Sequence, residues 1–201
     1  DITEVAEGYT GTDIGYFLEF DSYFWTEPAL QQFRVDYADN AELIPFDGND
    51  GSGKTMKCLS DPTFGYKSEV GFTIKNDIYS EAQRDFIASF VDKVYDIMYA
   101  AAYYDEAYIF NDTYSEIYKT TEITPQEAVE RVVNVSSLAD TYLINELLCD
   151  ADVYWSSFFL SADFGPEGDK KLTFEAHWDF DSAMGNKNRC VDGTGFYAAN
   201  I

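Results

Sequence analysis

The stretch Ser80–Tyr104, SEAQRDFIASFVDKVYDIMYAAAYY, contains the clearest structural signal in this chain of 201 residues. Its apolar residues recur every three or four positions, which predicts an amphipathic helix from about Glu81 to Tyr104. Ser80 is a typical N-cap residue, and Gln83 three positions later completes the pattern of a capping box. We therefore expect one long helix with a single apolar face, against which other elements pack.

Shorter elements are expected on both sides of this helix. Strands are predicted where the sequence alternates or is rich in aromatic and β-branched residues. Helices are predicted after Thr124-Pro125-Gln126-Glu127, which has an N-cap residue, a proline in the first turn and a glutamate at the third position, and after Ser136 or Ser137. The predicted elements are strands at Gly15–Asp21 and Val70–Lys75, helices at Pro125–Val133 and from Ser136 or Ser137 to near Cys149, and strands at Trp155–Ser161 and Lys171–His177.

The order of these elements, helices first and a hairpin late, predicts an α+β fold. The length suits a single domain over residues 1–201. Within it we expect an irregular strand-and-loop entry at 1–75, a helical part at 76–150, and a hairpin followed by an acidic loop at 151–201.

Composition narrows the possible partners. The chain has 13 basic and 37 acidic residues, a net charge of −24 at pH 7, and 46% hydrophobic residues. Such a charge repels phosphate backbones and anionic lipids, so neither nucleic acid nor a membrane is an expected partner. Divalent cations and basic proteins suit it better. The only histidine is His177, which excludes a histidine-rich zinc site.

Residues Gly48–Thr55 (GNDGSGKT) match the letters of a phosphate-binding P-loop, with Lys54 as the phosphate-binding lysine. The context is poor, because Pro45 precedes the motif where a buried strand is needed. The same loop partly resembles a calcium loop with Asp47, Asn49 and Asp50, although Cys58 stands where the closing glutamate belongs. A surface loop is the simpler interpretation of this segment.

A second phosphate-like motif is Asp163-Phe164-Gly165, which spells the metal-binding triplet of protein kinases. It falls in the predicted turn of the late hairpin, where Asp and Gly are favoured for backbone reasons alone. We interpret it as a turn.

Acidic residues gather at two points that a hairpin separates. Asp150 and Asp152 follow the helix that ends near Cys149, and Asp179 and Asp181 follow the hairpin. This order can bring carboxylates from two loops to one edge of a sheet, where one would orient a hydroxyl and others hold Mg²⁺ beside phosphates. The alternative is that these acids only make helix-end and turn hydrogen bonds.

Two segments that contain these acids resemble the CotH kinase family of secreted or spore-coat atypical protein kinases. They are Val133–Asp152 (VNVSSLADTYLINELLCDAD) and Trp178–Asn186 (WDFDSAMGN), and the strands GYFLEFD and FTIK resemble the family more loosely. The resemblance implies the C-terminal lobe of a protein-kinase-like fold, ATP with Mg²⁺ or Mn²⁺ as cofactors, and Ser/Thr of a secreted or surface protein as the acceptor. It implies Asp152 as the catalytic residue and Asp179 and Asp181 as metal ligands.

The chain departs from this family at three points. Asp150 stands where the family usually has Asn, and His177 where it often has Pro. The lobe with the nucleotide-binding lysine is expected before residue 1, with Lys54 as an alternative source of that lysine. The alternative function is therefore a non-catalytic, kinase-like binding or scaffold module of an extracellular assembly such as a cellulosome, and a P-loop NTPase is a third.

Overall fold

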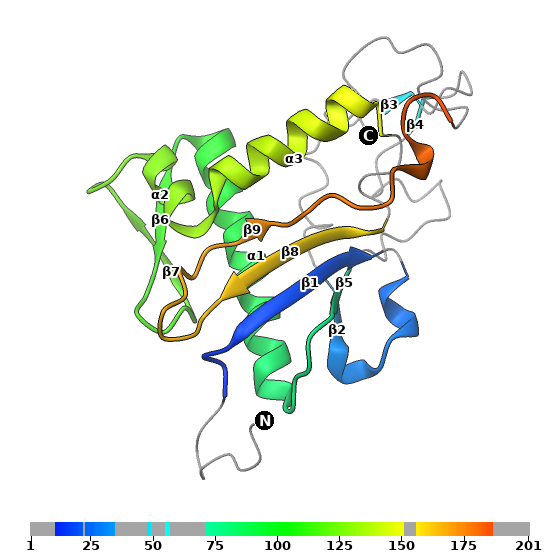
Figure 1. The fold of residues 1–201 in the computed structure, drawn as a ribbon. Coiled ribbons are helices and arrows are strands. Elements are labelled where there is room, and N and C mark those ends of the chain that lie inside the picture. The colour runs from blue at the N-terminus through cyan, green and yellow to red at the C-terminus, as the bar shows by residue number, and fades with distance from the viewer. Residues whose placement is uncertain are drawn as a thin grey trace.

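The computed structural model describes residues 11–21, 23–34, 48–49, 55–56, 71–150 and 156–186 (Figure 1). Helices and antiparallel strands both contribute, so the predicted α+β class is confirmed. The longer elements in chain order are β1 (Gly15–Asp21), β2 (Gln32–Arg34), β5 (Gly71–Ile74), α1 (Glu81–Tyr104), β6 (Ala107–Phe110), β7 (Ile117–Thr120), α2 (Pro125–Val132), α3 (Val135–Leu148), β8 (Phe158–Asp163) and β9 (Thr173–Phe174). The short ones are β3 (Gly48–Asn49), β4 (Thr55–Met56), and 3-10 turns at Phe24–Thr26, Ala29–Gln31 and Phe180–Ser182.

The central element is a five-stranded antiparallel sheet in the order β2-β5-β1-β8-β9. The predicted late hairpin is present as β8 and β9, and β8 also pairs along β1, which places the hairpin inside the central sheet. Leu18 of β1 lies opposite Ile74 on one side and Leu160 on the other. Since side chains alternate across a strand, one sheet face carries Tyr16 and Leu18 and the other carries Glu19 and Asp21.

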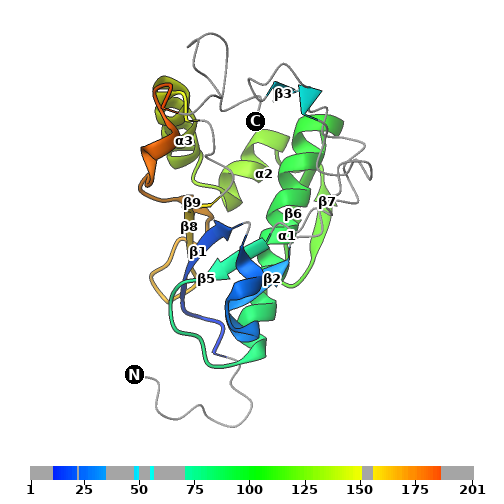
Figure 2. The ribbon, with the colours of Figure 1, turned by 90° about the vertical axis from the view of Figure 1, so that its right-hand side faces the viewer.

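Helix α1 covers the apolar face of this sheet (Figures 1 and 2). It has the predicted bounds, and Ser80 Oγ accepts a hydrogen bond from the Gln83 N–H. The predicted capping box is only half formed, because the Gln83 side chain accepts from Tyr79 N–H and donates to the Gly11 carbonyl instead. Buried apolar residues of α1 pack with those of the sheet in one core, and they are Ile87, Phe90, Val91, Val94 and Ile97.

The region predicted as helical also contains a hairpin that the sequence reading missed, β6–β7. Its turn is held by Asn111, whose side-chain oxygen accepts from Ser115 N–H at 2.9 Å. Helix α2 follows and begins with the predicted capping box, in which Thr124 and Glu127 bond reciprocally. Helix and hairpin lie together beside α1, at the end of the molecule away from β2 (Figure 1).

Helix α3 lies over β9, on the side of the sheet where the hairpin leaves it (Figure 1). Its N-cap is Asn134, whose Oδ1 accepts from Ser137 N–H, and not Ser136 or Ser137 as predicted. The Ser137 side chain instead bonds to the sheet: its Oγ accepts from the N–H of Phe174 in β9 at 3.0 Å. This contact fixes the helix against the late hairpin.

The triplet Asp163-Phe164-Gly165 lies at the end of β8 and in the β8–β9 turn, as expected. Asp163 Oδ1 accepts from the Gly165 N–H at 2.8 Å, which is a turn hydrogen bond. Phe164 is buried and packs edge-on against Phe86 and Phe90 of α1, with ring centroids 4.7 and 4.8 Å away. The triplet therefore serves the turn and the core.

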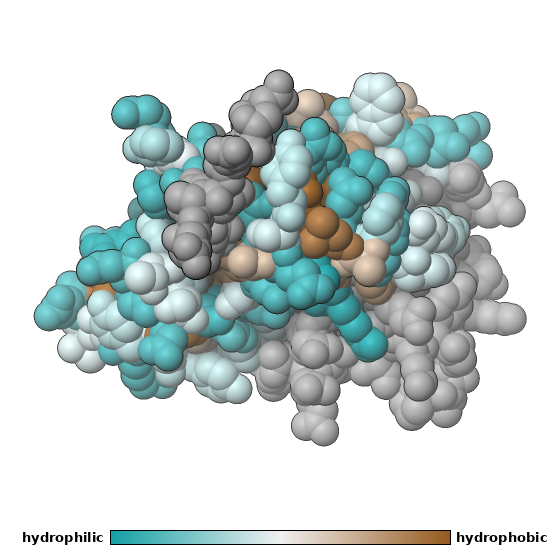
Figure 3. Space-filling view, turned by 90° about the horizontal axis from the view of Figure 1, so that it is seen from below, coloured by the Kyte–Doolittle hydropathy of each residue, from teal (hydrophilic) through white to brown (hydrophobic). Residues whose placement is uncertain are grey.

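None of the described helices is both long and apolar enough to cross a membrane. Seen from below, the described surface is mainly hydrophilic, with a small apolar patch near its middle (Figure 3).

Candidate functional site

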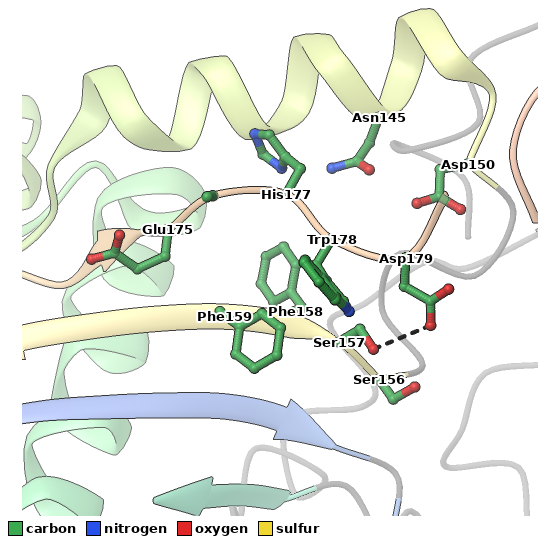
Figure 4. Close-up of a pocket in the computed structure, with 11 residues that line it drawn as sticks. Asn145, Asp150, Ser156, Ser157, Phe158, Phe159, Glu175, His177, Trp178 and Asp179 are labelled. Atoms are coloured by element: carbon green, nitrogen blue, oxygen red, sulfur yellow. Dashed lines mark hydrogen bonds between the residues drawn. The ribbon is translucent and has the colours of Figure 1, made fainter. Parts of the chain in front are cut away.

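A pocket lies between the C-terminal end of α3 and the ends of the late hairpin (Figure 4). Its hollow measures about 420 Å³, including the part that is open to solvent. The residues that line it are Asn145, Asp150, Ser156, Ser157, Phe158, Phe159, Glu175, Ala176, His177, Trp178 and Asp179. Both predicted acidic clusters thus contribute a residue to one pocket.

Asn145 of α3 and Asp150, just beyond the C-terminal end of this helix, form the upper wall of the pocket (Figure 4). The helix ends at Cys149, which has a left-handed backbone, and the chain then turns so that the Asp150 N–H bonds to the Asn145 carbonyl. Both residues are only 3% exposed, and Asn145 Nδ2 donates to the Thr141 carbonyl at 2.9 Å. Two polar groups are therefore held almost out of water at the pocket wall, which is the environment in which charge interactions are strong.

The hairpin supplies the opposite wall through Ser157 and Asp179. Ser157 Oγ donates to Asp179 Oδ2 at 3.3 Å, shown as the dashed line in Figure 4. Both residues have left-handed backbones, with φ values of 61° and 65°. Each such conformation in a residue other than glycine costs about 1–3 kcal/mol, and these costs concentrate at functional sites. The pair is thus held in place by surrounding structure.

An ion pair on the sheet connects with this wall. Lys75 Nζ lies 2.9 Å from Glu19 Oε2, and the other oxygen, Oε1, accepts from the Ser157 N–H at 2.9 Å. Hydrogen bonding to Glu19 raises the pKa of Lys75 above its usual value, with added attraction from Glu27 and Asp21. Glu19 is only 9% exposed. A continuous chain of polar contacts therefore runs from Lys75 through Glu19 and Ser157 to Asp179.

The predicted site residues have different outcomes. Asp179 lines the pocket, whereas Asp181 lies outside it, exposed, with its Oδ1 accepting from Ser182 Oγ at 3.1 Å. Asp152 lies outside the described residues, although Asp150 and Ser156, the nearest described residues on either side of it in the sequence, both line the pocket.

The described part of the chain contains no group of three or more His, Cys, Asp or Glu side chains placed to hold a metal ion. Mg²⁺ commonly binds through only one or two carboxylates, together with water and substrate phosphates. Asp179, with the carboxylate and amide oxygens of Asp150 and Asn145 on the facing wall, has the donor chemistry for that mode.

His177 and Trp178 complete the pocket at its hairpin side. Burial lowers the pKa of His177 below its usual value near 6.5, and the negative charge of Asp140 partly opposes this. Burial therefore favours the uncharged form of the imidazole. Trp178 is 70% exposed and offers a flat apolar surface at the edge of the pocket.

The P-loop letters do not produce P-loop geometry in their described part. Gly48–Asn49 and Thr55–Met56 pair as antiparallel strands β3 and β4, whereas a P-loop needs a helix to begin at the Lys-Thr end. Lys54 lies outside the described residues. Of the calcium-loop residues, Asn49 lies in β3, and Asp47, Asp50 and Cys58 lie outside the described residues.

Sequence reading did not single out Lys75, Glu19 or Ser157. A weak signal for Glu19 existed, since Glu19 and Asp21 share one face of a strand whose other face is apolar.

Comparison of the chain with protein-family models, with curated proteins and with solved structures found no match.

Proposed function

We propose that this chain is a CotH-like atypical protein kinase lobe, which transfers a phosphoryl group from ATP to Ser or Thr of a secreted, coat or surface protein. The observation that carries the proposal is the chain of contacts Lys75–Glu19–Ser157–Asp179 along one side of a pocket whose other wall holds Asn145 and Asp150. Ser157 and Asp179 of this chain line the pocket, whereas Lys75 and Glu19 connect to it through Ser157. Phosphoryl transfer depends on positioning and charge neutralisation, for which a lysine and several carboxylates linked to one pocket are suitable groups.

Each group has a role in this proposal. Asp179, with Asn145 or Asp150 opposite, would hold Mg²⁺ or Mn²⁺, which neutralises phosphate charge when bound. Lys75 would bind phosphate oxygens, with Glu19 fixing its position, and so supply the lysine that was expected before residue 1. Asp152 would accept the proton of the acceptor hydroxyl. Asp181 would support the loop that carries Asp179.

The test is thermal unfolding of the chain with and without millimolar ATP and Mg²⁺ or Mn²⁺. A ligand that binds only the folded state raises the melting temperature by mass action, so we expect a metal-dependent rise. Asp179→Asn should remove the rise. Glu167→Gln, which removes the same charge from the exposed β8–β9 turn, should keep it. An equal rise in both variants, or none in the unmodified chain, would contradict the proposal.

Transfer itself needs a separate measurement. With radiolabelled ATP and a histone mixture as a basic acceptor, Asp152→Asn should abolish labelling while the nucleotide-dependent rise in melting temperature remains. Loss of both would place Asp152 in binding rather than in proton transfer. Labelling that survives the substitution would remove it from the mechanism.

The second candidate function is a non-catalytic binding module. It is favoured by large exposed apolar side chains, including Trp178, Leu147 and Met184, which are 70–79% exposed. It predicts that nucleotide and metal leave the melting temperature unchanged.

The kinase proposal includes an extracellular or surface location, such as a spore coat, because the chain resembles the secreted or spore-coat CotH kinases.

A further inference from the structure

Helix α3 buries polar residues and exposes large apolar ones, although Leu138 on its inner side packs against the core. Its two buried residues are Thr141 and Asn145, which face the body of the protein. Its outer side carries an apolar residue at every fourth position, and the larger ones are well exposed: Val135 at 41%, Leu143 at 61% and Leu147 at 77%. A surface helix of a globular protein normally shows the opposite arrangement.

These residues form a continuous stripe, which we call the α3 stripe: Val135, Ala139, Leu143 and Leu147, all exposed. At a rise of 1.5 Å per residue its ends are roughly 18 Å apart, or about three helical turns. Beyond the C-terminal end lies Met184, 79% exposed, whose N–H bonds to the Leu148 carbonyl.

The two ribbon views agree that no other described helix or strand lies along the outer side of α3, which runs along the upper edge of the molecule (Figures 1 and 2). The high exposed fractions of Leu143 and Leu147 agree with this arrangement. Each step of four residues advances about 40° around a helix, so the stripe winds gradually around the outer side of α3. A partner helix that crosses α3 at an angle could follow it with apolar residues spaced by three and four.

The negative charge beside the α3 stripe favours a positively charged partner. Asp140 is exposed along one edge of the stripe and Glu146 lies along the other. The whole chain carries a net charge of −24, so a second copy would bring like charges together. A helix with Lys or Arg beside its apolar residues would be attracted at long range and would meet opposite charges at both edges.

We propose that the α3 stripe is a docking surface for a basic amphipathic helix of a partner protein. The inference does not depend on the proposed kinase activity, because the stripe lies on the opposite side of α3 from Asn145 and the pocket. Docking there leaves the pocket open, so binding of the two ligands is expected to be independent.

The test uses a fluorescein-labelled synthetic helix of 18 residues with Leu at helical spacing and Lys at the flanking positions. Fluorescence anisotropy would measure its dissociation constant for the chain, beside a peptide of the same pattern with Glu for Lys and a scrambled Leu/Lys peptide. We expect the Leu/Lys helix to bind at least tenfold more tightly than either control. Equal binding of the scrambled peptide would show nonspecific attraction and overturn the proposal.

The site is located with variants. Leu143→Ser with Leu147→Ser should weaken binding of the Leu/Lys helix at least tenfold. Tyr118→Ser, at a side chain 52% exposed on β7, is the matched control and should bind as before. All three side chains are exposed, so these changes should not unfold the chain. Unchanged binding in the double variant would overturn the assignment, as would sedimentation showing a dimer of this chain that the double variant abolishes.

Discussion

The ion pair between Lys75 and Glu19 gives the sharpest test of the polar chain that underlies the site. Lys75→Met removes the cation and leaves the Glu19 carboxylate, whose side chain is only 12% exposed, near Asp21 without its counter-ion. Glu19→Gln is the milder change, because the amide that replaces the carboxylate keeps an oxygen for the Ser157 N–H. Lys75, 33% exposed, can then turn to water or toward Glu27 at 3.9 Å.

The expected magnitude follows from this partial burial. Exposed pairs contribute about 0–1 kcal/mol, and breaking a fully buried pair costs about 3–5 kcal/mol. With one partner largely buried and the other a third exposed, we expect Lys75→Met to lower the free energy of unfolding by about 2 kcal/mol and Glu19→Gln by about 1 kcal/mol.

Urea unfolding of the two single variants and the double variant measures the coupling directly. The double variant should be more stable than the sum of the two single effects predicts, by about 1 kcal/mol, because it leaves no unpaired charge. Lys75→Met should also remove the ATP-dependent rise in melting temperature. If the two single effects add up to the effect of the double variant within about 0.3 kcal/mol, the Lys75–Glu19 pair does not contribute the expected coupling.

Two further predictions concern the site and its hairpin. His177, the only histidine, should titrate in proton NMR with a pKa below 6.5, because burial disfavours its charged form. Asp140→Asn should lower that pKa further, because it removes a nearby negative charge. The free energy of unfolding should fall as the pH decreases through the pKa of histidine in the unfolded chain, near 6.5. Gly168→Ala should destabilise the hairpin in thermal unfolding, because its new Cβ would lie 2.1 Å from the Asp163 carbonyl oxygen; Gly165→Ala, whose Cβ would meet only the movable Asp163 side chain at 3.0 Å, should cost less.

Much of the fold was predictable where the signal is local. The bounds of β1 and α1 agree with the prediction to the residue, since alternation and helical spacing each cover a whole element. The hairpin β6–β7 was missed because its strands have four residues each, too few to separate from a helix end by periodicity. At the start of α3 three neighbouring residues, Asn134, Ser136 and Ser137, are all good caps, so the sequence alone does not choose between them.

The pairing of β1 with β8 was not predictable by the same reasoning. It joins residues that are far apart in the chain, and no local pattern indicates which strands become neighbours. The site inherits this limit: the acids near Asp150 and Asp179 were found because each cluster is local, whereas Lys75, Glu19 and Ser157 meet only through the sheet order.

The position of β1 between β5 and β8 explains why one carboxylate can serve both sides of the site. Glu19 lies opposite Thr73 on one neighbour and Phe159 on the other, so its two oxygens reach Lys75 just after β5 and Ser157 just before β8. A register shift of one residue would turn Glu19 toward α1 and bring Leu18 to the polar face. The alternation that buries Leu18 in the core therefore also fixes the polar chain, so fold and candidate site depend on the same pattern in GYFLEFD.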